Sequence, residues 1–277
     1  MRVVPVVLWA LATGCAAPVV APQDLDELTS FLVENFENET STELSVGGEQ
    51  LQALLEDVPL DGSIADRSFT VSALSEASLG GMPAHSGFNE EAQAPVAIAW
   101  KSRFDVEEHL RIVAETNQVC IESGTTKYYG RTFVTDLSEF ESQASETLKT
   151  TNEVRKESIL GRVWYDIEKE YRWVKLPNDE MAVISRSWAP QAYPTDNGGG
   201  SFDQTYVLEV WLPDGTETVR YSAMWSSVTL AGISPNAWAG LVRNGLDEGG
   251  RFADDYLDDF ADRLCTQDRN RTYDRPQ

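Results

Sequence analysis

The feature of this 277-residue chain that most constrains its fold is the alternation of apolar and polar residues over 163–173. The apolar positions of VWYDIEKEYRW are Val163, Tyr165, Ile167, Tyr171 and Trp173. Lys169 is the one interruption of that apolar set. Successive side chains of a β-strand point to opposite faces, so this period of two predicts a strand with one apolar face.

Three later segments carry strand patterns as well: MAVISRSW (181–188), TYVLEVWL (205–212) and ETVRYSAMWSSVTL (217–230). A turn at 177–179 precedes the first of them, and the loop 189–203 precedes the second. Asp214-Gly215 is typical of a tight hairpin, because these residues tolerate the positive φ that such turns need. The sequence therefore predicts an antiparallel meander of four long strands.

Helical spacing precedes the meander. Leucines and phenylalanines recur every three to four residues over 24–36, and a second helical segment is expected at 48–56. A short strand at 96–100 is followed by a helical segment with Val106, Leu110 and Val113. We expect a mostly helical N-terminal region over 24–94 and an α+β domain over 95–270.

After the meander, Ser234-Pro235 is a good N-cap followed by proline at the first helical position. Gly249-Gly250 is expected to break this stretch. Beyond it, an apolar stripe at offsets of 3, 4, 7, 8 and 11 comprises Ala253, Tyr256, Leu257, Phe260, Ala261 and Leu264. The predicted fold class is α+β, with an N-terminal helical region and then an antiparallel meander of four or more strands packed against a C-terminal amphipathic helix.

The order of these elements over 127–264 resembles the helix-grip arrangement of START-like domains. That resemblance implies a domain that binds a lipid or another small molecule. It rests on element order, without a motif residue, and cystatin-like sheets and other α+β layers share that order. Fold alone does not determine function.

The chain is strongly acidic, with 45 Asp and Glu against 22 Lys and Arg and a formal net charge of −23. Such a surface repels phosphate backbones, so nucleic acid is excluded as an expected partner. The acidity needs no ligand to explain it, since surface carboxylates keep a protein soluble.

The first residues, through the stretch ALATGC, resemble a bacterial lipoprotein signal: one positive charge, an apolar run, two small residues and Cys15. The resemblance implies a signal peptide at 1–14, lipidation of Cys15, and a tether at 15–23 that attaches the protein to the membrane. Ala16 stands where inner-membrane retention signals have Asp, which favours the outer membrane of a bacterial envelope. Plain secretion, an uncleaved anchor and a cytosolic core segment remain alternatives.

Two cysteines remain, Cys120 and Cys265. In an exported chain they permit one intramolecular disulfide, which is the favoured hypothesis. Two buried free thiols are the alternative. A metal site is disfavoured because neither cysteine has a Cys or His partner at ligand spacing.

No catalytic motif, cofactor motif or phosphate-binding loop is present, so no catalytic residue and no cofactor are predicted. His85 and His109, the two histidines, are interpreted as solvated or capping residues. Asp254, Asp258 and Asp262 share a helical face, but side chains along a straight helix rarely converge on a metal. We interpret them as the solvent-exposed face of the helix and predict no metal site.

Tryptophans lie on all four predicted strands: Trp164, Trp173, Trp188, Trp211 and Trp225. They either line a ligand cavity or fill the core, and core packing is favoured. The hypothesis is an exported, non-enzymatic lipoprotein that binds a small molecule, lipid or envelope partner through residues that the sequence leaves unknown. A hydrolase of envelope glycans with an unrecognised carboxylate pair, and a purely structural lipoprotein, are the alternatives.

Overall fold

The computed structural model describes residues 18–258 except 120, 123, 159–160 and 231. Within them the strands form one antiparallel sheet in the order β1-β2-β9-β8-β6-β5-β4-β3, with β7 paired to β8. The strands are β1 Ser68–Phe69, β2 Ala94–Ser102, β3 Thr126–Phe133, β4 Thr147–Ser158, β5 Gly161–Lys175, β6 Met181–Trp188, β7 Tyr193–Pro194, β8 Gly200–Asp214 and β9 Glu217–Leu230. The α-helices are α1 Leu25–Glu34, α2 Thr42–Leu55, α3 Val106–Ala114, α4 Leu137–Glu141 and α5 Pro235–Asp258.

The predicted meander is confirmed as β5-β6-β8-β9, and the α+β class with it. Strands β6 and β9 coincide with the predicted segments 181–188 and 217–230. The turn between β8 and β9 has Gly215 at φ +66°, as the Asp-Gly pair predicts.

Two parts of the sheet were not predicted from the pattern of apolar and polar residues. Strand β8 begins at Gly200, inside the predicted loop, and the hairpin of β3 and β4 was not predicted. In β4 polar residues occupy both faces, as in Asn152 and Glu153, so the apolar alternation that marks β5 is missing. Helix α2 also begins at Thr42, earlier than the predicted 48.

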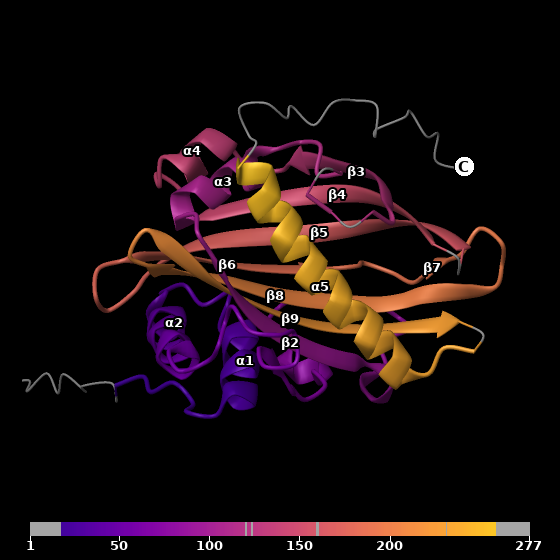
Figure 1. Ribbon diagram of the computed structural model, residues 1–277, viewed down its shortest axis with the longest axis horizontal. Coiled ribbons are helices and arrows are strands. Elements are labelled where there is room, and N and C mark those ends of the chain that lie inside the picture. Colours follow the sequence, from indigo (N-terminus) through magenta and orange to yellow (C-terminus); the bar gives the residue numbers. More distant parts are fainter. Residues whose placement is uncertain (1–17, 120, 123, 159–160, 231, 259–277) are drawn as a thin grey trace, which may run out of the picture.

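Helices α1 and α2 cover one face of the sheet, which we call the α1/α2 face (Figure 1). Its core is a single cluster of 26 buried residues that joins these helices to β2, β5, β6, β8 and β9. Leu208 and Trp225 at its centre are fully buried. The N-terminal helices are therefore held by continuous apolar packing.

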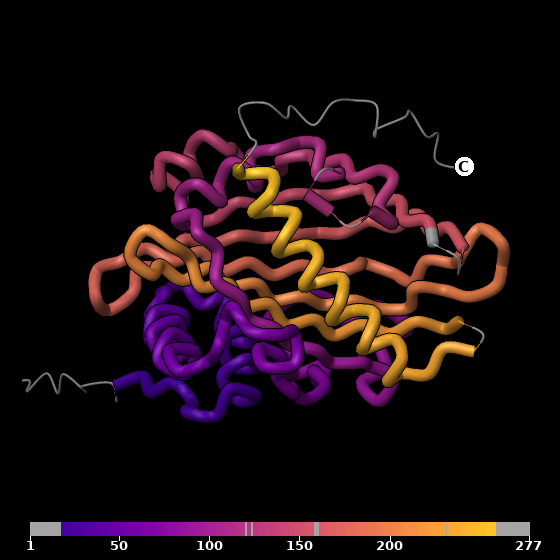
Figure 2. The backbone as a smooth tube through the Cα atoms, in the orientation of Figure 1, coloured from indigo at the N-terminus to yellow at the C-terminus, as the bar shows by residue number. Residues whose placement is uncertain are grey.

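Helix α5 lies diagonally across the opposite face, which we call the α5 face (Figure 1). Ser234 caps it, with Oγ accepting from the Ala237 N–H at 3.2 Å, as predicted. The end of α5 contacts α3, so residues 106–114 and the last turns of α5 lie side by side (Figure 2).

The predicted break at Gly249-Gly250 is wrong, because α5 runs unbroken from Pro235 to Asp258. A Cβ built on Gly250 would lie 2.6 Å from the indole of Trp100 on β2. The glycine lets the helix backbone approach that ring, and the packing it permits offsets its low helix propensity.

Several predictions concern residues outside the described ranges. Cys15, Cys120 and Cys265 are among them, as are Asp262 and the apolar positions beyond 258. The lipidation and disulfide hypotheses therefore remain predictions. Among the helices that the structure describes, none combines the length and apolar character needed to cross a bilayer.

Candidate functional site

The α5 face is packed less completely than the α1/α2 face. Its buried apolar residues fall into separate clusters, one around Trp173 and Trp211, one around Tyr165, and one under the end of α5. Val207 and Met224, which lie opposite each other on β8 and β9, are only half-buried. Solvent therefore reaches the middle of the sheet on this face.

The apolar side chains of α5 that face the sheet are also unevenly buried along the helix. Ala253, Tyr256 and Leu257 in its second half are buried. In its first half Val242 is buried, whereas Trp238 and Leu246 on the same side of the helix are half-buried. Apolar side chains of helix and sheet thus remain partly accessible where the first half of α5 crosses the sheet.

Polar side chains occupy inward positions of this face. Lys169 on β5 forms an ion pair with Glu209 on β8, and Ser185 Oγ donates to Glu209 at 3.1 Å. Burial raises the pKa of Glu209, but the charges of Lys169 and Arg220 outweigh it and lower this pKa to about 2. An ionised, paired carboxylate is unsuited to the general acid that the hydrolase hypothesis requires.

Arg220 on β9 lies between two tryptophans. It pairs in register with Trp100 on β2 and Trp211 on β8, and its guanidinium carbon is 4.8 Å and 5.5 Å from their ring centroids. Burial lowers the pKa of Arg220, while the charges of Glu209 and Asp254 raise it. Even so, the guanidinium stays protonated at neutral pH.

Donor atoms around Arg220 lack partners. Within the described residues, Arg220 Nε and Nη1 and the indole nitrogens of Trp100 and Trp211 are buried without a hydrogen bond. So is Ser222 Oγ, two positions along β9. Buried donors without partners are costly and rare in native proteins. Such atoms occur on the α1/α2 face too, at Arg172 Nε and Trp188 Nε1, but the nitrogens of Arg186, whose guanidinium carbon is 5.6 Å from the Trp188 ring centroid, have partners.

His109 on α3 also belongs to this polar group. Its interpretation as a solvated or capping residue is therefore wrong. It is fully buried, with Nε2 3.0 Å from Ser102 Oγ, and Ser102 donates to Asp254 at 2.7 Å. Burial and the charge of Arg220 hold the pKa of His109 well below its usual value, so the ring is neutral. Ser102 is fully buried and gives its proton to Asp254, so these three groups do not form a nucleophilic triad.

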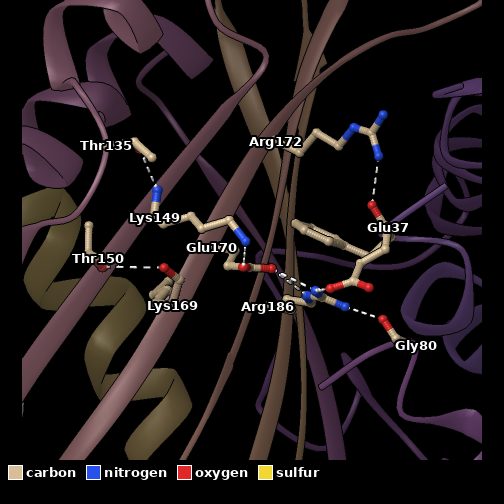
Figure 3. A network of polar contacts seen from close by, with 10 residues as sticks. Glu37, Gly80, Thr135, Lys149, Thr150, Lys169, Glu170, Arg172 and Arg186 are labelled. Carbon is tan, nitrogen blue, oxygen red and sulfur yellow. Dashed lines mark hydrogen bonds and ion pairs between the residues drawn. The ribbon is translucent and has the colours of Figure 1, made fainter. Parts of the chain in front are cut away.

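Arg186, on the α1/α2 face, shows how a buried arginine is satisfied (Figure 3). Its Nε donates to Glu170 at 2.9 Å, and its terminal nitrogens contact Glu170, Glu37 and the carbonyl of Gly80. This network joins the sheet to the segments that follow α1. Because each nitrogen of Arg186 has a partner within the protein, the arginine has a structural role.

Two of the surface cavities among the described residues border helices α5 and α1. One, of about 590 Å³, lies beside the second half of α5 and includes Lys101, Arg251 and Asp254. The other, of about 460 Å³, lies between the end of α1 and the Gly80-Gly81 turn. Since Asp254 bonds to Ser102, the first cavity borders the polar group around His109.

The structure divides the predicted tryptophans between the faces. Trp173 and Trp211 belong to the α5 face, and Trp188 and Trp225 to the α1/α2 core. Trp211 shares its face with Glu209, and Trp225 shares its face with Ala223, as the alternation of side chains along a strand requires.

The acidic cluster is engaged by neighbours: Asp254 bonds to Ser102, and Asp258 pairs with Arg103. Over the described ranges, no group of His, Cys, Asp and Glu is arranged to hold a metal ion.

Arg220 and Glu209 were not recognised as candidate site residues from the sequence, and Lys169 stood out only as the interruption of an apolar set. Their positions along the strands could have revealed them. Each of the three charged residues stands at a position that faces the core, where the alternation of the strand predicts an apolar residue. A charged residue at such a position is the mark of a buried polar site.

Comparison with known proteins gives matches at the level of solved structures alone. No family model and no curated protein matches the chain. A STAR-related lipid transfer protein fragment from Xanthomonas axonopodis is 11% identical, with 64% of this chain and 97% of that chain covered and a TM-score of 0.44.

A human lipid transfer and protein localization domain is 10% identical, covers 59% of this chain and 76% of its own, and has a TM-score of 0.36. An aromatase/cyclase from a Streptomyces species is 8% identical, covers 62% and 95%, and has a TM-score of 0.35. These similarities concern the arrangement of strands and helices, and at such scores they carry nothing about function.

Proposed function

We propose that this chain is a binding module that holds a small apolar or amphipathic molecule between the first half of α5 and the middle of the sheet. The observation that carries the proposal is the partial exposure of Val207, Met224 and Leu246 on facing elements. A structural role would be served by the dense packing seen on the α1/α2 face.

Accessible apolar side chains accompanied by a few polar groups are typical of ligand sites, where the polar groups fix the orientation of the ligand. The Lys169–Glu209 pair and Arg220 are such polar groups, set among apolar neighbours. The acidic exterior keeps a module of this kind soluble while it carries an apolar ligand.

The test is a fluorescence titration with Nile red, a neutral apolar probe, on the wild type and two variants. Met224→Trp fills the accessible part of the face and is expected to weaken probe binding at least tenfold. Val134→Trp is the matched control, because Val134 is 61% exposed outside the face. Equal binding by all three proteins, each with native circular dichroism, would contradict the proposal.

Attachment of this module to a bacterial envelope through Cys15 is a separate proposal that rests on the resemblance of residues 1–15 to a lipoprotein signal. Intact mass of the natively expressed protein tests it. A species that begins at Cys15 and carries acyl mass supports the anchor, and a species that retains Met1 and has no added mass contradicts it.

A further inference from the structure

Three residues of the α5 face that carry unpartnered nitrogen donors lie in one row across three strands. Trp100, Arg220 and Trp211 are paired in register on β2, β9 and β8. Directly opposed residues of an antiparallel pair have Cβ atoms about 5 Å apart, so each indole is a direct neighbour of the Arg220 guanidinium. Each residue is more than nine-tenths buried.

These atoms are N–H donors, which determines the chemistry that satisfies them. An arginine fork and an indole N–H donate and cannot accept. The complementary group is therefore an acceptor with more than one lone pair, and a carboxylate matches the fork in two parallel hydrogen bonds. A cation is excluded here by the charge of Arg220.

The charged neighbours of this row are engaged with other groups. Lys169 pairs with Glu209, and Asp254 accepts a hydrogen bond from Ser102. Glu209 and Asp254 are the carboxylates whose charges act on Arg220. Among the described residues neither of them forms a hydrogen bond with Arg220 Nε or Nη1, so these donors stay available to a further acceptor.

The same face continues from Arg220 to apolar positions. Ser222 and Met224 follow Arg220 at two-residue steps of β9, and Val207 lies beside Met224 on β8. Four residues of strand span about 13 Å, which sets the distance from the donor row to the half-buried apolar side chains. An acyl chain of medium length covers that distance.

We propose that Arg220, with the indole N–H of Trp211 beside it, binds the carboxylate of an amphipathic acid whose apolar chain lies against Met224 and Val207. This inference rests on the proposed function, since it names the class of ligand that the α5 face takes. His109, buried beside Trp211 with ring centroids 5.6 Å apart, helps to position the indole.

The experiment is a fluorescence titration at pH 7 with dansyl-undecanoate and its methyl ester, alongside Nile red. The wild type is expected to bind the acid at least tenfold more tightly than the ester, as charge-assisted hydrogen bonds require. Arg220→Met is expected to bring the affinity for the acid down to the affinity for the ester. Arg162→Met, at an exposed arginine on β5, is the matched control and is expected to keep the wild-type preference.

Trp211→Phe keeps an aromatic ring without the N–H and is expected to reduce the preference for the acid about threefold or more. This second variant keeps the inference testable if Arg220→Met does not fold. Equal affinity of the wild type for acid and ester, with Nile red bound, would overturn the carboxylate site and leave the proposed function standing. Absence of binding by all three probes would overturn both.

Discussion

Arg186 and Arg220 lie on opposite faces of the same sheet and are buried to a similar extent, at 1% and 7% exposed. Arg186 has carboxylates and a carbonyl on its nitrogens (Figure 3). Arg220 has tryptophan rings beside it and, within the described part of the chain, no partner for Nε or Nη1. Burial alone therefore does not tell a structural arginine from a functional one.

The difference extends to the faces themselves. The α1/α2 face joins its helices and strands in one continuous core, whereas the α5 face leaves Val207 and Met224 within reach of solvent. A continuous core and a fully partnered buried arginine favour stability, and a face that lacks both is less stable than it could be, which is expected where the face has another role. Binding is the use that we assign to it.

The largest effect is expected at the paired arginine. Of the ion-pair partners Arg186 and Lys149, Arg186→Met leaves the buried carboxylate of Glu170 with Lys149 alone. It also leaves the Gly80 carbonyl without its donor, and the free energy of unfolding should fall by about 3–5 kcal/mol. Urea denaturation measures it, and the double variant with Glu170→Gln should recover part of the loss. A loss below about 1 kcal/mol would mean that the network adds little stability.

Substitutions at two adjacent residues of β8 allow a direct comparison of how much packing on each face of the sheet contributes to stability. Leu208→Ala, on the α1/α2 face, should cost about 2–5 kcal/mol, because it opens a cavity in a packed core. Val207→Ala, on the α5 face, should cost less than about 1 kcal/mol, because its side chain is half-buried. Equal costs in urea denaturation would show that both faces are packed alike.

Acid should weaken the ion pair of the α5 face. The pKa of Glu209 falls from 4.5 to about 2 on folding, so its contribution to stability is present above pH 4.5 and is lost as the pH falls toward 2. The stability difference between wild type and Glu209→Gln should shrink by about 2 kcal/mol from pH 5 to pH 3. A difference that stays constant in denaturation curves at the two pH values would refute the lowered pKa.

The smallest effect on stability is expected at the unpartnered arginine. Arg220→Met removes a buried cation and two unsatisfied donors, and Lys169 still holds Glu209. The free energy of unfolding should change by less than about 1 kcal/mol, or rise. A loss comparable to that of Arg186→Met would show that Arg220 is a structural residue.

The strands and helices with strong periodicity could be predicted from the sequence. The face of β5 that carries Tyr171 and Trp173, the hairpin at Gly215 and the cap at Ser234 follow from local pattern and turn chemistry. The hairpin of β3 and β4 could not, because its polar residues hide the period. The continuity of α5 depends on Trp100, far away in sequence, which no local rule takes into account.

The residues of the candidate site could not be predicted from the sequence for a related reason. Arg220, Trp100 and Trp211 are brought together by strand pairing, and their spacing along the chain carries no motif. His109 looked like a surface residue because glutamates precede it, yet α3 turns it toward Ser102. Tertiary contact, and not residue type, makes these groups a site.

The most direct test of the central claim is the indole N–H spectrum of protein labelled with ¹⁵N-tryptophan, recorded as sodium decanoate is added. Trp173 and Trp225 already donate to carbonyls of Phe140 and Ser72, at 2.9 Å and 2.7 Å, and serve as internal controls. The predicted result is a downfield proton shift of the Trp211 indole resonance, assigned from Trp211→Phe, while both controls stay in place. A Trp211 resonance that does not move at saturating decanoate would contradict the account.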